Sequence, residues 1–549
     1  MHLSVTGDRI AIRGLPFGDS GRVRELANAR WHSADKFWSA PATPAVALHM
    51  IDLFRGRDID ADGMAWADLA IKAGAIRAAQ WAKTAPETDL PSPRITPIVD
   101  SWLHQKRAVT FASALEASML AFYMGRGKTK AAIDLMRNRG CKRVLISCPA
   151  NVMRVWTREL ARHGPEYEPL VLPRTMTVAK RMALAGLHLS AAKAAGKPMA
   201  VIVNHEALWR EPFAAWIKDD VRPFDHFVMD ESHRGKQHNG ALGNFIKDLW
   251  KFIPSRMALT GTPYPHSMMD IFAQFRMLDP GVFGTSWTRF KERYAVMGGF
   301  QGKNVVGVQN LEELQAKFEM LAYYVEDDEN LPELIETFRS FALTAEARKI
   351  YKTLERDLFV ALKNGEIIAG NVLVKLLRLQ QITSGYCRMS DGVTDVFVGE
   401  EKIKLLADLL ENELPKPAIV FCRFREDLDR IRDLCQKTEL RYGEVSGRQS
   451  DLTDDATMPE WADVFGVQIQ AGGVGIDLTR ARVAVFYSVD YRLDNYKQCI
   501  KRLHRQGQEH AVTIVHLTAD DTVDEDIYDA LTKRAELVET ILGRCAHGV

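Results

Sequence analysis

A glycine-rich turn between an apolar segment and a helical one limits most strongly what this chain can fold into. The turn, GRGKT at 125–129, follows the apolar run 117–123 and precedes the helical run 130–136. Strand, loop and helix in this order are typical of a phosphate-binding loop, where glycine N–H groups and a helix N-terminus face phosphate oxygens. Gly125 and Gly127 allow that approach, Lys128 can reach the β- and γ-phosphates, and Thr129 can ligate Mg²⁺.

Composition sets broad limits on the rest of the chain. At 549 residues it is too long for one hydrophobic core, and about three to four units are expected. The formal net charge is only +1, so a nucleic-acid surface must be a local patch. Seven scattered cysteines without a CxxC pair argue against structural zinc and a disulfide framework. With no signal-peptide pattern and no membrane-length apolar run, we expect a cytoplasmic protein, or a nuclear one in a eukaryotic host.

Alternating apolar strands and helices predict an α/β protein with parallel sheets. The strands expected first lie at 144–150, 199–206, 226–232 and 256–263, and a second series starts after residue 417. The predicted division is a small α+β unit at 1–55, a helical linker at 56–98, an ATP-binding lobe at 99–290, a mostly helical insertion at 291–400 and a second lobe at 401–549.

Two acidic residues complete the nucleotide site in the first lobe. Asp230 and Glu231 follow the apolar run 226–229 directly. Ligands of open α/β sheets gather at the carboxyl ends of the strands. We expect Asp230 to hold Mg²⁺ and Glu231 to orient and deprotonate the attacking water.

A third element lies on a predicted helix near the C-terminus. Arg502 and Arg505 stand three residues apart, so they project from one helical face, and Gln498 lies four residues earlier. Guanidinium groups stay charged and bind phosphate oxygens in pairs. We expect both arginines to act on the γ-phosphate in the transition state.

In this order, the elements resemble the superfamily-two helicases, and among them the Swi/Snf-type ATPases, from about residue 103 to 538. The matching segments are LHQ at 103–105, MGRGKT at 124–129, SCP at 147–149, DESHRGK at 230–236, LTGTP at 259–263, AGGVGIDL at 471–478, QCIKRLHRQGQ at 498–508 and DTVDEDI at 521–527. The resemblance implies two RecA-like lobes with ATP and Mg²⁺ in the cleft between them.

The resemblance also implies roles for individual residues. For ATP it implies contacts by Gln105, Gly475 and Asp477. It also implies that hydrolysis is coupled to DNA through four residues: His233, Thr260, Thr262 and Gln498. The implied DNA contacts, mainly to phosphates, are Asn151, Asn204 and His205 in the first lobe, and Arg423, Ser446, Gln470 and Gly472 in the second.

Several positions depart from the family pattern. Phe122 and Tyr123 replace an acidic pair before the phosphate loop, and Asp477 replaces an asparagine. Pro265 and His266 stand where the family usually has Gln-Asn, and the segment YRL at 491–493 replaces Trp-Asn-Pro. These differences indicate a divergent member of the family.

The N-terminal segment ARWHSADKFWSAP, at 29–41, resembles the signature of the HARP domain of annealing helicases. The resemblance implies contacts to branched or single-to-double-strand DNA by Trp31 and Trp38, with Arg30 and Lys36 at analogous positions. The alternative reading is that these aromatic residues form a small core.

The expected activity is therefore an ATP-dependent DNA translocase that remodels duplex or branched DNA by annealing or fork regression. Two alternatives remain: a strand-separating helicase on DNA or RNA, for which the short polar stretch 447–461 offers no obvious wedge, and a DNA-binding scaffold with an inactive ATPase. We expect a monomer whose protein partners are single-strand-binding, replication or repair proteins.

Overall fold

The computed structural model describes residues 1–549 except 56–59, 62, 124, 151, 174–175, 220, 262, 265–267, 299–303, 326–330, 364–368, 389–394, 471–475, 506 and 532–549. The chain forms two compact units, Met1–Asp327 and Asp328–Thr540. Each contains a mostly parallel sheet with helices on its faces, as the sequence predicts.

The first unit begins with a small antiparallel module. The module sheet has the order β3-β4-β2-β1-β5. Strands β1 and β2 pair as a hairpin with His2 opposite Arg13 and Thr6 opposite Arg9, and Gly7 takes a φ of 60° in the turn. The elements are β1 His2–Thr6, β2 Arg9–Arg13, α1 Ser20–Val23, β3 Arg30–His32, β4 Phe37–Pro41, α2 Pro44–Leu53, β5 Asp60–Ala61 and α3 Gly63–Ala79.

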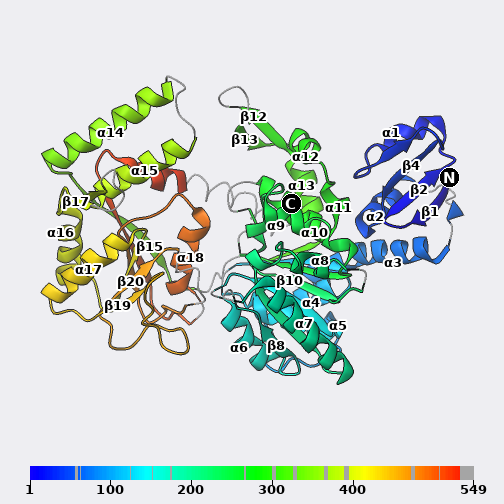
Figure 1. Ribbon diagram of the computed structural model, residues 1–549, viewed down its shortest axis with the longest axis horizontal. Helices are drawn as coiled ribbons and strands as arrows, with labels where there is room; N and C mark the ends of the chain where they lie inside the picture. The colour runs from blue at the N-terminus through cyan, green and yellow to red at the C-terminus, as the bar shows by residue number, and fades with distance from the viewer. Residues whose placement is uncertain are drawn as a thin grey trace. The chain divides into compact units, whose positions relative to one another are not determined.

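A parallel sheet with the order β14-β6-β11-β10-β7-β9-β8 forms the core of the first unit (Figure 1). Strands β6, β9 and β10 are buried along their whole length, which is typical of central strands covered on both faces. The strands are β6 Ala117–Phe122, β7 Arg143–Cys148, β8 Glu168–Val171, β9 Met199–Asn204, β10 His226–Met229, β11 Ser255–Leu259 and β14 Ala322–Val325.

Helices connect these strands in the alternation that the sequence predicts. They are α4 Leu103–Ser113, α5 Lys128–Arg139, α6 Met153–His163, α7 Val178–Ala194, α8 Phe213–Ile217, α9 Ala241–Ile246, α10 Ile271–Leu278, α11 Pro280–Phe283, α12 Trp287–Tyr294 and α13 Leu311–Glu319. An antiparallel pair, β12 Ala295–Gly298 and β13 Asn304–Val308, separates α12 from α13.

The stretch 291–400 is rich in helix, as predicted, but it is not a separate insertion between the lobes. Strand β14 extends the first sheet beside β6, and β15, Leu334–Phe341, lies in the second sheet beside β22. The second unit therefore begins at Asp328 and not at residue 401. The helices of this stretch are α14 Ala345–Lys363 and α15 Ala369–Thr383, followed by the antiparallel pair β16 Tyr386–Arg388 and β17 Asp395–Phe397.

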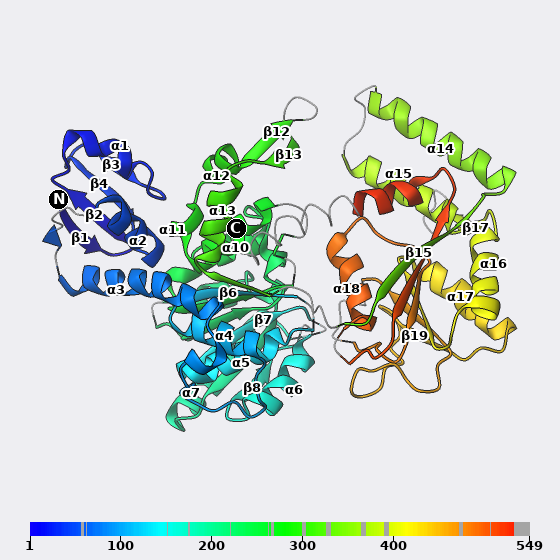
Figure 2. The same cartoon turned by 180° about the vertical axis from the view of Figure 1, so that it is seen from behind.

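The second unit has a parallel sheet with the order β15-β22-β21-β18-β20-β19. Its remaining elements are α16 Glu401–Asp408, β18 Ala418–Cys422, α17 Arg425–Lys437, β19 Tyr442–Val445, β20 Val464–Gln468, β21 Val483–Phe486, α18 Leu493–Leu503 and β22 Val512–Ala519. Helices α16 and α17 cover one face and α18 covers the other, in both views (Figures 1 and 2).

The alternation of side chains along β18 explains this two-sided covering. Val420 and Cys422 point to the face where Leu428 and Ile431 of α17 pack. Their neighbour Phe421 points to the opposite face, into the cluster that also contains residues of α18. Because the strand is apolar on both faces, it is stable only with helices on both sides.

Among the described residues, no helix is long and apolar enough to cross a membrane. The six cysteines that the structure describes are all free thiols, as expected from their scattered positions.

Candidate nucleotide site

The predicted nucleotide-site residues of the first unit follow the carboxyl ends of neighbouring strands. β6, β11, β10, β7 and β9 are adjacent and parallel. The phosphate loop follows β6, Thr260 follows β11, and Asp230 follows β10. These segments therefore meet at one edge of the sheet, where ligands of open α/β folds bind.

The phosphate loop has the backbone that only glycine tolerates at two positions. Gly125 and Gly127 have φ values of 81° and 70°, and α5 begins directly after Gly127 at Lys128. A Cβ on Gly127 would collide with Nε2 of Gln105. Lys128 Nζ donates to the Phe122 carbonyl at 3.1 Å, so the ammonium lies beside the loop. The loop is thus shaped to approach phosphate oxygens with backbone N–H groups.

Gln105 ties the start of α4 to this loop. Its Oε1 accepts a hydrogen bond from Trp102 N at 3.0 Å, and its Nε2 donates to the carbonyls of Arg126 and Gly127 at 3.4 Å each. His104 Nε2 lies 2.9 Å from the Arg126 carbonyl. The residue predicted to contact adenine therefore lies against the phosphate loop.

Trp102 is a residue of this site that the sequence analysis missed. Its indole lies 3.5 Å from where a Cβ on Gly127 would be, and it is 41% exposed. An aromatic face beside a nucleotide loop offers a stacking surface for a base. The tryptophan three residues before Gln105 was the available sequence signal.

Asp230 is buried at the end of β10. Trp156 Nε1, from α6, donates to its Oδ2 at 2.9 Å. Burial, and then the neighbouring Glu231 carboxylate, raise the pKa of Asp230 to about 6. Two close carboxylates in a buried place are a favourable environment for a cation.

The residues present fit a magnesium ion that arrives with ATP. Thr129 at the start of α5 and Asp230 would hold it, and the ion would neutralise phosphate charge. Over the part of the chain that the structure describes, no group of three or more His, Cys, Asp or Glu side chains is arranged for a metal. This fits Mg²⁺, which usually takes one or two protein carboxylates plus substrate phosphates and waters.

Glu231 takes a left-handed backbone conformation, with φ of 48°. Its N–H donates to Asp230 Oδ1 at 2.9 Å, and its Oε2 lies 3.4 Å from His233 Nδ1. The same His233 nitrogen lies 3.1 Å from Thr260 Oγ1. The predicted general base and the two predicted coupling residues therefore form one connected group.

Gln274 of α10 extends this group and was also missed. It is fully buried, its Oε1 accepts from Ser232 Oγ at 2.7 Å, and its Nε2 donates to the Pro263 carbonyl at 3.0 Å. One side chain thus links the segment after β10 to the segment after β11. A lone glutamine within an apolar helix, FAQFRML, was the available signal.

Packing explains why Phe122 stands where the family pattern has an acidic residue. The side chain is fully buried at the end of β6 and makes edge contacts with His104 and Tyr323, at ring-centroid distances of 5.5 and 6.0 Å. Tyr323 belongs to β14, which is Phe122's neighbour in the sheet. Phe122 is therefore a core residue of this lobe, and its presence does not indicate a decayed site.

The prediction that Arg502 and Arg505 project from one helical face is corrected, because α18 ends at Leu503 and Arg505 lies in the bend after it. Arg505 is partly buried, and its Nε is buried without a hydrogen-bond partner among the described groups. Gln498 is 9% exposed on α18, while Arg502 lies in the last turn of the helix. Gln508 has a structural role, since its Nε2 donates to the carbonyls of Thr479 and Ala481 at 3.0 Å each.

Asp477 also has a local structural role. Its Oδ1 accepts from Thr479 N at 2.9 Å and from Thr479 Oγ1 at 2.7 Å, which fixes the turn after residue 476. The predicted residues Gly475, Thr262, Asn151 and Gly472 lie outside the described residues, as do Pro265 and His266.

Two predicted DNA contacts of the first unit need correction. Asn204 and His205 are each 2% exposed. Asn204 Nδ2 donates to Glu206 Oε2 at 2.5 Å, and His205 Nδ1 lies 2.7 Å from Ser147 Oγ. Burial lowers the pKa of His205 to about 3, so it is neutral. In this conformation both side chains support the strand ends and do not face solvent.

Three predicted DNA contacts of the second unit lie on one edge. Arg423, Ser446 and Gln470 follow β18, β19 and β20, which are adjacent and parallel. Gln470 is exposed, and Arg423 is partly buried with its guanidinium bonded to Gln380 Oε1. They therefore lie on one edge of the sheet, although only Gln470 is fully open to solvent.

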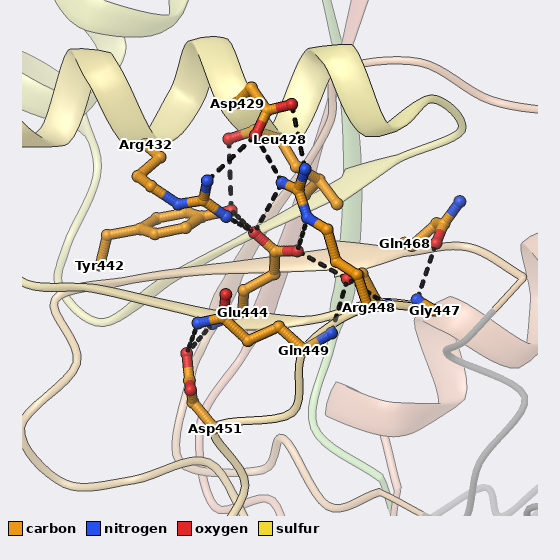
Figure 3. Close-up of polar contacts among 11 residues, drawn as sticks. Leu428, Asp429, Arg432, Tyr442, Glu444, Gly447, Arg448, Gln449, Asp451 and Gln468 are labelled. Atoms are coloured by element: carbon orange, nitrogen blue, oxygen red, sulfur yellow. Dashed lines mark hydrogen bonds and ion pairs between the residues drawn. The ribbon is translucent and has the colours of Figure 1, made fainter.

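An ionic network holds the loop after β19 in place (Figure 3). Glu444 is fully buried, and Arg448 and Arg432 both donate to its carboxylate, with Arg448 Nε at 3.1 Å. Burial alone would raise the pKa of Glu444. The hydrogen bonds that its carboxylate accepts from Arg448 and Ser446 outweigh burial, so the pKa lies below its ordinary value. Gly447 N donates to Gln468 Oε1 at 3.0 Å, which ties this loop to the end of β20.

In the N-terminal module, Trp31 and Trp38 face each other across β3 and β4. Their rings lie 5.5 Å apart, Trp31 is 50% exposed and Trp38 is 8% exposed. The prediction that both tryptophans contact DNA is corrected for Trp38, because its neighbours cover it. Trp31 alone keeps an open face.

A phosphate loop and two adjacent carboxylates in one α/β unit, and two arginines at and just after the end of α18 in the other, are typical of a nucleotide-hydrolysing enzyme of superfamily two. A sequence profile of the SNF2-related domain matches residues 104–385, and one of the helicase conserved C-terminal domain matches 401–507. The first match alone spans more than half of the 549 residues. The chain therefore belongs to the SNF2 family, whose ATP-hydrolysing core has two RecA-like lobes.

Individual relatives are distant. The chain is 26% identical to the chromodomain-helicase-DNA-binding protein 1-like of Danio rerio, over 78% of this chain and 42% of that protein. It is 24% identical to the chromatin-remodelling ATPase ISW1 of Saccharomyces cerevisiae, over 78% of this chain and 39% of that one. The chain thus spans about two fifths of the length of these two relatives.

Protein p41 of Acyrthosiphon pisum secondary endosymbiont phage 1 matches over 93% of its own length and 76% of this chain, at 24% identity. Among solved structures, the SWI2/SNF2 ATPase core of Sulfolobus solfataricus in complex with duplex DNA covers 82% of this chain and 95% of that one, at 21% identity and a TM-score of 0.38.

Proposed function

We propose that this protein is an ATP-dependent DNA translocase of the Swi/Snf type, which moves along duplex or branched DNA and remodels it by annealing or fork regression. One observation carries the proposal: the residues needed for hydrolysis are distributed over both units. Lys128, Asp230 and Glu231 belong to the first unit. Arg505, whose Nε is buried without a hydrogen-bond partner among the described groups, belongs to the second. Hydrolysis that requires both units can be coupled to their relative movement.

DNA as the partner is supported by the chemistry of the strand-end loops. Polar side chains and backbone N–H groups, at Ser446 and Gln470, contact phosphates without reading sequence. Binding should therefore be independent of sequence and sensitive to salt. The N-terminal module adds an exposed aromatic residue, Trp31, of the kind that stacks on an unpaired base at a junction.

A strand-separating helicase is the second candidate, and one observation favours it. The second unit contains an antiparallel pair, β16–β17, which the sequence analysis did not anticipate. Phe397 at the end of β17 is 69% exposed. An exposed aromatic residue on such a pair has the chemistry of a wedge that stacks against a base pair.

ATP hydrolysis with different nucleic acids tests the proposal. The purified chain is assayed alone and with linear duplex, single strands, forked DNA and duplex RNA, and Glu231→Gln is the control. We expect duplex and forked DNA to stimulate hydrolysis, and the variant to lose it by about 10²–10⁴-fold. Stimulation by single strands or RNA alone, together with displacement of a strand from a fork, would support the helicase. If no nucleic acid supported hydrolysis, only the DNA-binding scaffold with an inactive ATPase would remain.

A further inference from the structure

A cavity of the first unit lies between the N-terminal module and α11–α13, away from the nucleotide site. Its volume is about 820 Å³, within the range of about 300–1,000 Å³ typical of ligand sites. The module contributes Arg24, Asn28 and His49, and α12 and α13 contribute Arg289, Arg293 and Lys317. In both views α11 lies beside α2 (Figures 1 and 2).

The two walls of this cavity are fixed to each other. Asp279, just before α11, is 4% exposed and its Oδ2 accepts from Ala45 N of α2 at 3.0 Å. Lys251 Nζ lies 2.5 Å from Asp8 Oδ2, and Thr285 N donates to Asn28 Oδ1 at 3.1 Å. The cavity is therefore part of the folded first unit.

The cavity carries more positive than negative charge. Four cationic side chains line it against two carboxylates, Glu25 and Glu313. Glu313 is already bound by Arg293 and Lys317, at 2.5 and 2.9 Å. Among the described carboxylates, none forms an ion pair with Arg24 or Arg289. These two exposed guanidinium groups remain available for an anion from solvent.

An aromatic surface continues from Arg24. Its guanidinium lies 5.9 Å from the centre of the Trp38 ring, and Trp38 packs on the half-exposed Trp31. Arginines for phosphates beside an aromatic face for a base are the combination that binds unpaired nucleic acid. Free inorganic phosphate would use the cations but would leave the tryptophan unused.

We propose that this cavity binds the phosphodiester backbone of a single-stranded DNA segment, with Arg24 and Arg289 holding phosphates and Trp31 stacking on a base. The inference rests on the proposed function in taking DNA as the ligand. It adds a second DNA-binding place, specific for the unpaired arm of a branched substrate. The translocase lobes would then act on the duplex beside that arm.

The test compares a blunt duplex with the same duplex carrying a single-stranded arm, using the full chain and fluorescence anisotropy at low salt. We expect the Arg24→Glu/Arg289→Glu variant to bind the tailed duplex about tenfold more weakly, with unchanged ATP hydrolysis on the blunt duplex. The matched control is Lys180→Glu/Lys193→Glu, which makes the same charge change on exposed positions of α7. We expect it to bind both duplexes as the parent does.

A milder pair, Arg24→Gln/Arg289→Gln, guards against a folding defect, and its thermal unfolding should match that of the parent. Trp31→Ala should also weaken binding of the tailed duplex, by about fivefold or more. The inference would be overturned if both arginine double variants bound the tailed duplex with an affinity within twofold of that of the parent. If inorganic triphosphate alone displaced the single-stranded arm from the cavity, the inference would be overturned and a free phosphate would be the ligand. Absence of duplex-stimulated hydrolysis in the parent would instead refute the proposed function.

Discussion

At the scale of single residues, Trp102 is the addition that most changes the nucleotide site. The indole lies beside the turn of Gly127 and is partly open to solvent. We expect Trp102→Ala to raise the KM for ATP by about tenfold with little change in kcat, because base stacking is worth about 1–3 kcal/mol. Steady-state kinetics measure both constants. The control is Trp81→Ala, a comparably exposed tryptophan (48%) outside the site; an equal change in both variants would contradict the assignment.

Gln274 tests the connection between the two strand-end segments of the first unit. We expect Gln274→Ala to lower the DNA-stimulated rate by about fivefold while the basal rate and the KM for ATP stay within twofold. The reason is that Ser232 and the Pro263 carbonyl lose their common partner. Gln274→Glu should share the defect, since it keeps an acceptor for Ser232 and loses the donor. A stimulation ratio equal to that of the parent would show that Gln274 only fills space.

At the scale of elements, the helix α17 carries a buried carboxylate with a predictable effect on stability. Burial raises the pKa of Asp427 to about 6, despite a hydrogen bond from Ser488 Oγ and the charge of Lys402. A raised folded-state pKa means that stability is greatest when the group is protonated. It falls as pH rises from the unfolded pKa of about 3.9 to about 6, by up to about 3 kcal/mol.

We therefore expect the stability of Asp427→Asn, relative to the parent, to increase between about pH 4 and 6 and then to level off. Denaturant unfolding at several pH values measures the difference. Asp433→Asn, an exposed position on the same helix, controls for the loss of one charge. A difference for Asp427→Asn that is constant with pH would contradict the pKa direction.

The elements also show what the sequence can and cannot predict. Strands such as β7, β9 and β18 were predicted because strands buried on both faces are continuous apolar runs. Strand β15 was missed because it lies at an edge of its sheet and mixes polar with apolar residues without a regular period, Glu336 and Arg339 among them. Strand β14 was missed because it follows α13 almost directly, so its apolar residues read as a continuation of the helical pattern.

The nucleotide-site motifs were predicted for a different reason: phosphate and metal chemistry restricts residue type and spacing within one loop. The exposure of the residues proposed to contact DNA could not be predicted in the same way, because burial depends on how the whole lobe packs. Asn204 ends β9 and His205 follows it, where a DNA contact is expected, yet both side chains are buried and bonded to Glu206 and Ser147. Gln274 lies about forty residues from its partner Ser232, so no local pattern could connect them.

At the scale of the whole molecule, hydrolysis is expected to need side chains of both units. We predict that Arg505→Ala lowers kcat by about 10³-fold or more, with ATP affinity within about threefold of the parent, because an arginine finger acts in the transition state. Nucleotide binding by fluorescence and phosphate release separate the two effects. Arg441→Ala, a surface arginine of the same unit paired with Asp463, is the control. Weak ATP binding with unchanged kcat would contradict the role.

Translocation on duplex DNA is the central claim, and displacement of a third strand from a DNA triplex measures it most directly. The triplex is placed at one end of a long duplex, and release of the third strand is followed with ATP, without ATP and with Glu231→Gln. The account predicts ATP-dependent release by the parent chain and none by the variant, with the duplex strands still paired. Duplex-stimulated hydrolysis without release of the third strand would contradict it.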